Sequence, residues 1–370
     1  MSMRCPSEST GPDTHTRKRG RFLSGHRAIA TDRVNPVETG FSRHCESPRC
    51  CCWYDTSIEA WQYTRGIHHD NMGDNLENTM LTRRTLLQTA LATSFAKGQS
   101  GLPKKAKITS SVMLWTLKGS FEARVEIAAK AGMQSIELVA EHINWTDAEA
   151  AAKLKFVRSF NLGLDTIIAT PDWVKRPVSM VNPEQRDNFL TDVKTAIGWA
   201  QKLESPQIIL MGGNAISGKT YEEQYASLVE GSKRAADLAA KANLTLIFEP
   251  LNSKVNHKGY FLTTCVEGLK LVKDVDNPHL RLLFDIYHEQ VQIGNVIRTL
   301  TEAAPHVAVF HVADNPGRND PGTGELNYAN IYKAIQKTGY SGYITMEYLP
   351  LGDPVASLNK AVDEMRANVV

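Results

Sequence analysis

Cysteine is almost absent from the larger, C-terminal part of the chain. The 370-residue sequence has six cysteines, and Cys265 is the only one after residue 52. The others cluster near the N-terminus, as Cys5, Cys45, Cys50, Cys51 and Cys52. Because a single thiol cannot form an internal disulfide, the sequence excludes a fold stabilised by disulfide bonds within the region beyond residue 52.

Long apolar runs and a large net charge are also missing. No apolar stretch approaches the roughly 18 residues that a membrane-spanning helix needs, so we expect no stable membrane insertion. The formal net charge is only +2, which gives no basis for expecting a nucleic-acid partner. The composition, 42% hydrophobic and 22% charged, is typical of a globular protein with a sizeable core.

Residues 1–79 differ in character from the rest of the chain. They are rich in Arg, Ser, Thr, Pro, His and Cys and show little helical or alternating periodicity. The three adjacent cysteines at 50–52 do not provide the paired C-x2-C spacing of a zinc site. We therefore expect residues 1–79 to be a disordered or untranslated extension.

Residues 80–96 resemble a twin-arginine export signal. Arg83 and Arg84 precede a short, mildly apolar segment that ends in small residues at Ala96. A helix start with two chance arginines is the alternative interpretation. Because an export signal must lie at the N-terminus, we expect Met80 to be the true start and the protein to be periplasmic or otherwise exported. Without a working signal we expect it to be cytoplasmic.

From residue 107 onward, short apolar runs alternate with longer amphipathic stretches. The runs predict strands at 108–114, 135–139, 164–169, 207–211, 244–249, 280–285, 307–311 and 342–347. The amphipathic stretches predict helices at 121–131, 148–160, 183–203, 221–242, 265–275, 296–304, 331–338 and 356–366.

Eight strand–helix units match the number and size of a (β/α)8 TIM barrel, with residues 107–370 as a single domain. A doubly wound open sheet is the alternative. It requires a Gly-rich phosphate loop after the first strand, and residues 113–119 read Met-Leu-Trp-Thr-Leu-Lys-Gly. The sequence therefore predicts the barrel.

The last four apolar runs each end on a residue that can bind a metal. These residues are Glu249, Asp285, His311 and Glu347. An unpaired buried charge costs several kcal/mol, so such residues need a reason to stand at the ends of buried strands. In a barrel the C-terminal strand ends open onto one mouth, where the four side chains can converge on one cation. Three carboxylates and one imidazole suit Mn²⁺, Mg²⁺ or Co²⁺.

Several motifs carry a resemblance to a known family. They are Ser111-Val-Met-Leu-Trp115, Ala131-Gly132 with Ile136-Glu137, Phe248-Glu249-Pro250-Leu251-Asn252, Gly259-Tyr260-Phe261-Leu262, Asp285-Ile286-Tyr287-His288, Pro316-Gly317-Arg318, Gly324-Glu325-Leu326-Asn327-Tyr328 and Glu347-Tyr348. From residue 111 to about 354, the chain resembles hydroxypyruvate isomerases within the xylose-isomerase-like barrel superfamily.

The resemblance implies an isomerisation of the aldose–ketose type, interconverting hydroxypyruvate and 2-hydroxy-3-oxopropanoate through an enediolate. It implies that the four strand-end residues are the metal ligands and that His288 and Arg318 bind substrate. Ligation leaves one oxygen of each glutamate free, so we expect Glu249 to be the base and Glu347 its partner. Arg318 offers the planar fork that matches a carboxylate.

Two further residues are candidate substrate contacts. His257 follows the fifth predicted strand, although a solvated loop histidine is the alternative interpretation. Glu137 ends the second predicted strand, from which it can reach the pocket. We expect a small hydroxy-carbonyl or sugar substrate, and a homo-oligomer is compatible with the sequence.

Two departures from the family pattern keep further functions open. The seventh-strand residue is His311, as in ketose 3-epimerases, where typical hydroxypyruvate isomerases have glutamine. The loop after the eighth strand carries Leu351 where that family often has arginine. The functions that stay open are a ketose 3-epimerase or another sugar isomerase, a non-catalytic sugar-binding barrel, and a metal-dependent endonuclease. An endonuclease would need more metal ligands and a basic face.

Overall fold

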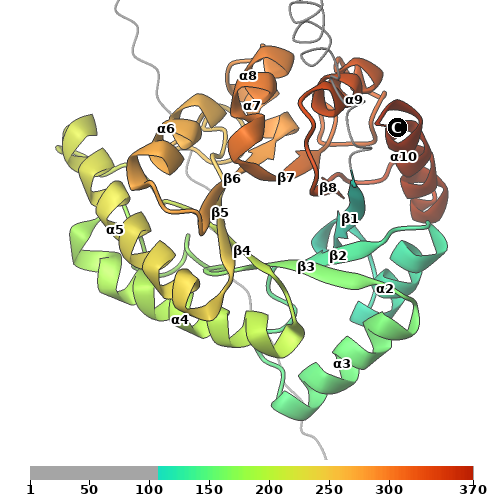
Figure 1. Cartoon of the computed structure of the whole chain (residues 1–370), viewed down its shortest axis with the longest axis horizontal. Helices are drawn as coiled ribbons and strands as arrows, with labels where there is room; N and C mark the ends of the chain where they lie inside the picture. Colours follow the sequence, from blue (N-terminus) through green and yellow to red (C-terminus); the bar gives the residue numbers. More distant parts are fainter. Residues whose placement is uncertain (1–106, 370) are drawn as a thin grey trace, which may run out of the picture. The chain divides into compact units, whose positions relative to one another are not determined.

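The computed structural model describes residues 107–369, which form a closed barrel of eight parallel strands ringed by helices (Figure 1). Each strand pairs with the next in the sequence, and β8 closes the ring on β1. The predicted (β/α)8 barrel is confirmed. The predictions for residues 1–79 and for the export signal at 80–96 lie outside the described residues and stay predictions.

All eight predicted strands are present. Their bounds are β1 Thr109–Met113, β2 Ser135–Leu138, β3 Gly163–Ile168, β4 Gln207–Leu210, β5 Thr245–Phe248, β6 Leu280–Asp285, β7 Val307–Val312 and β8 Tyr343–Met346. Nearly every strand residue is buried, because each strand packs against helices on one face and against the barrel interior on the other.

The helices follow the predicted order, with one additional helix, α7, and with differences of up to three residues in several bounds. Their bounds are α2 Phe121–Lys130, α3 Asp147–Ser159, α4 Arg186–Leu203, α5 Tyr221–Ala242, α6 Cys265–Val275, α7 Ile286–Gln292, α8 Val296–Ala303, α9 Tyr328–Lys337 and α10 Pro354–Asn368, with short 3-10 turns at Leu114–Thr116, Pro183–Gln185 and Ala304–His306. Helix α9 begins three residues earlier than predicted, because the side chain of Asn327 caps it by accepting from Asn330 N.

Helix α7 was not predicted, and it matters for the site. It starts directly after β6, and the Asp285 side chain caps it by accepting from the backbone N–H of His288 at 3.0 Å. A helix of seven residues is too short to give a clear periodic pattern in the sequence. The cap fixes His288 one turn beyond the strand end.

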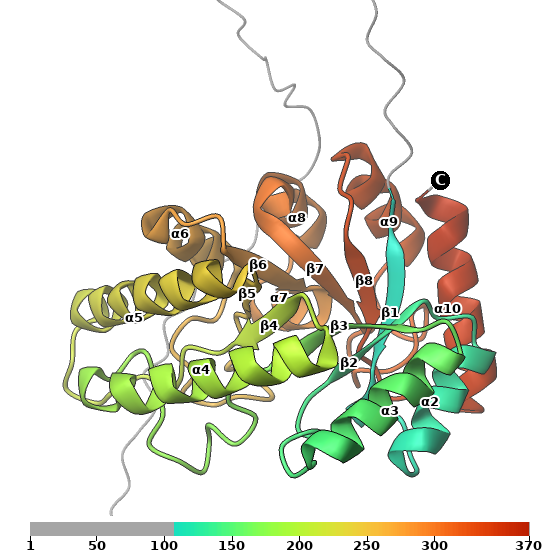
Figure 2. The same ribbon diagram turned by 60° about the horizontal axis from the view of Figure 1, so that its bottom comes forward.

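The apolar core has two layers. The outer layer lies between the strands and the surrounding helices, as where α4 and α5 lie side by side outside β4 (Figure 2). The inner layer fills the barrel with Met113, Ile209, Ile247, Leu283, Val309 and their neighbours. The inner layer is packed, so a small molecule can reach the strand ends only at the mouth. Within residues 107–369, no helix combines the length and apolar character needed to cross a membrane.

Candidate active site at the barrel mouth

The structure brings the four predicted metal ligands together. Glu249 and Glu347 directly follow β5 and β8, while Asp285 and His311 lie in the C-terminal parts of β6 and β7. One donor atom from each residue lies within 4.8 Å of the donor atoms of the others, and all four residues are buried. Ligands about 2.0–2.6 Å from one hard cation are separated by at most about 4–5 Å, so the cluster has the right size for a single ion.

The charges of this cluster also fit a cation. Three carboxylates lie beside a single imidazole, and the neighbouring cation is Arg318, whose Nη2 lies 2.8 Å from Glu347 Oε2 and 3.1 Å from Asp285 Oδ2. Buried carboxylates that are not compensated by positive charge are strongly destabilising. A divalent ion held by Glu249, Asp285, His311 and Glu347 would supply the missing charge.

Two aromatic rings lie close to the guanidinium of Arg318. Its guanidinium carbon lies 5.6 Å from the ring centre of Trp115 and 5.2 Å from that of Tyr287. These cation–π contacts orient the planar guanidinium group, which also lines the cavity.

The two glutamates of the cluster are in different environments. Glu347 Oε1 accepts a hydrogen bond from Trp115 Nε1 at 3.0 Å, and its Oε2 lies 2.6 Å from His311 Nδ1. Burial would raise the pKa of Glu347, but Arg318 and His311 outweigh it and hold the pKa below its usual range. Burial and the charge of Glu347 raise the pKa of Glu249 to about 8. Glu249 is thus the carboxyl that holds a proton more readily.

This difference predicts pH-dependent metal binding. Glu249 must lose its proton to act as a ligand, so protons compete with the ion below the Glu249 pKa of about 8. We expect the affinity for Mn²⁺ to fall as the pH is lowered from 8 to 6, by up to about tenfold per pH unit. Isothermal titration calorimetry at several pH values checks this. The same affinity at pH 6 and pH 8 would contradict it.

His288 is a buried, neutral hydrogen-bond donor. Its Nδ1 accepts from the backbone N–H of Asn252 at 3.1 Å, which leaves the proton on Nε2. Burial and the nearby Arg318 hold the pKa of His288 well below its usual range. Among the described residues Nε2 has no hydrogen-bond partner, and His288 lines the mouth cavity. It can therefore donate to a substrate oxygen.

The mouth cavity has a volume of about 360 Å³ and contains most of the predicted site. Its lining includes Glu249, Glu347, His288, Arg318 and His257. The His257 ring lies 5.4 Å from that of His288, so the loop histidine is part of the cavity wall.

The cavity lining also includes residues that were not predicted as site residues. Trp115, Trp173 and Asn256 all line the cavity, and Trp115 also contacts Glu347 and Arg318. Trp115 belongs to the Ser111–Trp115 motif, which was the available signal. Trp173 and Asn256 lie in loops, whose paths the sequence pattern does not reveal.

Glu137 is not in the cavity. Its side chain is fully buried inside the barrel, where it accepts a hydrogen bond from Thr345 Oγ1 at 2.7 Å and lies 3.1 Å from His311 Nε2. Glu137 is the last residue but one of β2, and it is absent from the cavity lining. The predicted substrate contact of Glu137 stays a prediction.

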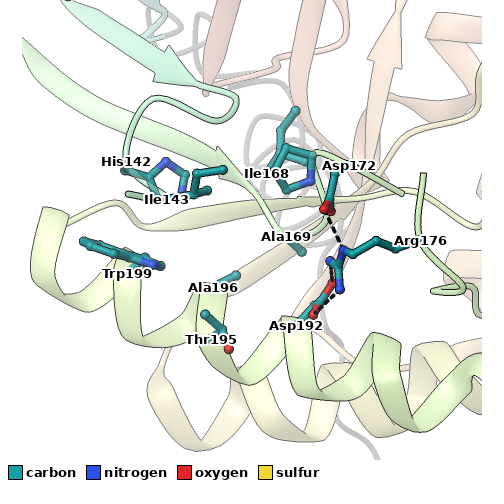
Figure 3. Close-up of a pocket in the computed structure, with 11 residues that line it drawn as sticks. His142, Ile143, Ile168, Ala169, Asp172, Arg176, Asp192, Thr195, Ala196 and Trp199 are labelled. Atoms are coloured by element: carbon teal, nitrogen blue, oxygen red, sulfur yellow. Dashed lines mark hydrogen bonds and ion pairs between the residues drawn. The ribbon is translucent and has the colours of Figure 1, made fainter. Parts of the chain in front are cut away.

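A second cavity lies beside the mouth and shares Ile168 and Pro171 with it (Figure 3). Its one cation, Arg176, is paired with two aspartates. Burial lowers the pKa of His142 to about 4, so this histidine is neutral near pH 7. The second cavity contains none of the predicted site residues and offers no free charge for catalysis.

Comparison with known proteins places the chain in a family. The family described as "Xylose isomerase-like TIM barrel" matches residues 125–367. The hydroxypyruvate isomerase of Escherichia coli (strain K12) is 33% identical over 234 residues, covering 62% of this chain and 88% of that relative. The 2-oxo-tetronate isomerase of Pectobacterium atrosepticum is 26% identical over 240 residues, covering 63% of this chain and 87% of that relative.

Solved structures show the same fold. A crystal structure titled AP endonuclease, family 2, from Brucella melitensis aligns with a TM-score of 0.62 at 25% identity, covering 68% of this chain and 96% of that one. Together with the eight-stranded barrel and the strand-end cluster, the comparisons give a consistent assignment. The chain belongs to the xylose isomerase-like TIM-barrel superfamily and, within it, to the hydroxypyruvate isomerase-like family, and it is an isomerase.

Proposed function

We propose that this isomerase depends on a divalent metal ion and interconverts hydroxypyruvate and 2-hydroxy-3-oxopropanoate. The observation that carries the proposal is the one buried cluster of three carboxylates and one imidazole within residues 107–369, two members of which, Glu249 and Glu347, line a small cavity. Hard oxygen donors with one imidazole favour Mn²⁺, Mg²⁺ or Co²⁺. When bound, such an ion polarises the carbonyl and the adjacent hydroxyl, so that the C–H between them becomes acidic.

Glu249 and Glu347 are the proposed proton carriers. The reaction removes a proton from C3 of hydroxypyruvate and returns a proton to C2 of the resulting enediolate, while the hydroxyl proton moves from O3 to O2. Glu249 lines the cavity and has the raised pKa expected of a carboxyl that accepts a proton near neutral pH. Glu347, held by Trp115 and Arg318, is the proposed partner for the return step.

Arg318 and His288 are the proposed substrate-binding groups. Arg318 can pair with the substrate carboxylate through its planar fork, and His288 Nε2–H can donate to a substrate oxygen. His257 closes the wall beside them.

We expect a conservative change at Arg318 to weaken substrate binding while the protein still folds. Lysine keeps the charge but loses the planar guanidinium and its cation–π contacts with Trp115 and Tyr287. We expect Arg318→Lys to raise KM for hydroxypyruvate by about 10-fold to 100-fold, as for a lost charge-assisted hydrogen bond of about 1.5–3 kcal/mol. Initial-rate kinetics measures this. An unchanged KM would exclude Arg318 from carboxylate recognition.

A longer substrate is the second candidate, favoured by the size of the cavity. About 360 Å³ exceeds the space that a three-carbon acid fills, and two tryptophans line the walls. The similarity to 2-oxo-tetronate isomerases points to a four-carbon acid, and a ketose 3-epimerase would use the same cluster. Turnover of these substrates but not of hydroxypyruvate would select this candidate.

An endonuclease and a non-catalytic sugar-binding barrel have less support. An endonuclease with several metals needs more ligand groups, but residues 107–369 contain one cluster of three or more His, Cys, Asp or Glu donors. A sugar-binding barrel without activity needs neither glutamate at the cavity floor. Exchange of substrate carbon-bound hydrogen with solvent tests the latter directly, because only a catalyst that moves protons produces it.

A further inference from the structure

Glu137 is a buried charged residue that the proposed reaction does not use. It lies in β2, its side chain is fully buried, and the cavity at the mouth does not include it. A buried carboxylate is tolerated where it is paired and hydrogen-bonded, since an isolated one is strongly destabilising. Its contacts therefore indicate what it does.

The two oxygens of Glu137 face two different neighbours. Oε1 accepts a hydrogen bond from Thr345 Oγ1 at 2.7 Å, which fixes the carboxylate plane. Oε2 lies 3.1 Å from His311 Nε2, an ion-pair contact without the alignment of a hydrogen bond, and neither atom has another partner among the described residues. Strand register supports this geometry, because His311 on β7 lies opposite Thr345 on β8.

The two nitrogens of His311 point to opposite sides. Nε2 faces Glu137 below, while Nδ1 faces the cluster, 2.6 Å from Glu347 Oε2 and 3.9 Å from Glu249 Oε1. The nitrogen that binds a cation must be unprotonated, so the ring proton must then lie on the opposite nitrogen. A carboxylate beside Nε2 stabilises a proton there and leaves the Nδ1 lone pair directed at the cluster.

We infer that Glu137 is a positioning residue, which holds the Nε2–H of His311 and thereby presents Nδ1 to the metal ion. The inference rests on the proposed metal-dependent function. Carboxylates that orient ligating histidines in this way fix the tautomer and raise the basicity of the ligand, and their loss typically lowers metal affinity 10-fold to 100-fold. Glu137 thus acts on the ion through His311, without touching substrate.

Metal affinity of the purified protein tests this inference independently of turnover. Free Mn²⁺ is measured by electron paramagnetic resonance during titration of the wild type, Glu137→Ala, Glu137→Gln and Glu289→Gln. We expect Glu137→Ala to bind Mn²⁺ 10-fold to 100-fold more weakly. Glutamine is isosteric and its neutral amide oxygen can still accept from Nε2–H, so we expect an intermediate loss of about tenfold. The glutamine variant also provides the test if the alanine variant does not fold.

Glu289→Gln is the matched control. Glu289 is also a buried glutamate, but it accepts from the backbone N–H of Cys265 at 2.8 Å, a contact that involves neither Glu137 nor His311. We expect this variant to bind Mn²⁺ within about twofold of the wild type, because glutamine can still accept this hydrogen bond. An equal loss of affinity in Glu289→Gln and Glu137→Gln would show that Glu137 acts only through general packing and would overturn the inference.

The tautomer of His311 can be observed by spectroscopy, and it would not depend on Glu137 if Glu137 had only a structural role. In Mg²⁺-saturated protein with ¹⁵N-labelled histidine, long-range ¹H–¹⁵N spectra should show His311 with Nε2 protonated and Nδ1 unprotonated, and a His311→Asn variant assigns the signal. Protonated Nδ1, or wild-type Mn²⁺ affinity in folded Glu137→Ala, would overturn the inference while leaving metal dependence intact. A wild type that binds neither Mn²⁺ nor Mg²⁺ would overturn the proposed function and this inference with it.

Discussion

Replacing Glu249 with glutamine is expected to lower kcat by at least about 10³-fold with hydroxypyruvate. A positioned general base typically contributes about 10²-fold to 10⁴-fold, and this carboxylate is also a proposed metal ligand. Glutamine keeps the size of the side chain but cannot take up a proton. Because Glu249 lines the cavity and has a pKa raised to about 8, it is the carboxyl best placed to receive the substrate proton. Steady-state kinetics with saturating Mn²⁺ measures the loss.

A matched control distinguishes chemistry from a general effect of removing a buried carboxyl. Glu289 is also a buried glutamate, but it accepts from the backbone N–H of Cys265 at 2.8 Å and lies outside the cavity lining. We expect Glu289→Gln to keep kcat within about threefold of the wild type, because glutamine can still accept this hydrogen bond. Near-normal turnover by Glu249→Gln would show that the proton-transfer assignment is wrong.

Removing the metal is expected to abolish turnover and to destabilise the barrel. Without the ion, the three carboxyl groups remain buried beside His311 and Arg318, and Glu249, whose pKa is raised to about 8, holds a proton near neutral pH in place of the ion. An ion present at about 1,000 times its Kd stabilises the folded state by about 4 kcal/mol. For a barrel of this size that corresponds to a rise in Tm of roughly 10 °C.

The measurement is thermal unfolding and activity after treatment with EDTA, followed by addition of Mn²⁺, Mg²⁺ or Co²⁺. We expect both Tm and turnover to return with at least one of these ions. The Glu347→Gln variant should show a smaller gain in Tm on adding Mn²⁺, because it loses a charged donor of the cluster. Full activity in metal-depleted protein would contradict the proposed function.

The barrel and the position of its site were predictable because both depend on local patterns. Each buried strand appears as a short apolar run, and the polar residue that ends it stands out against the apolar background. Glu249, Asp285 and Glu347 were identified in this way, and the general rule that barrel strands end at one mouth predicted their convergence. The bounds of α5 and α6 were also predicted correctly, since long amphipathic helices give the clearest periodicity.

What could not be predicted depends on contacts between residues far apart in the sequence. Trp115 reaches Glu347 across 232 residues, and no local pattern reveals that hydrogen bond. Successive side chains along β2 face the barrel interior and the surrounding helices in turn, so this alternation does not reveal how deep below the mouth the Glu137 side chain lies. A register shift beside β3, between Ile136 and Glu137, adds to this uncertainty. The sequence therefore identified Glu137 as a site residue but did not reveal its contacts with His311 and Thr345.

The most direct test of metal-dependent proton transfer follows hydroxypyruvate by NMR in D₂O, with purified protein and Mn²⁺ added at trace level. The proposed function predicts that 2-hydroxy-3-oxopropanoate forms and that carbon-bound hydrogen of hydroxypyruvate is replaced by deuterium. Both signals should disappear after EDTA treatment, return with added Mn²⁺, and be absent in Glu249→Gln. Neither product nor deuterium incorporation from hydroxypyruvate in the metal-loaded wild type, or both at full rate after metal removal, would contradict it.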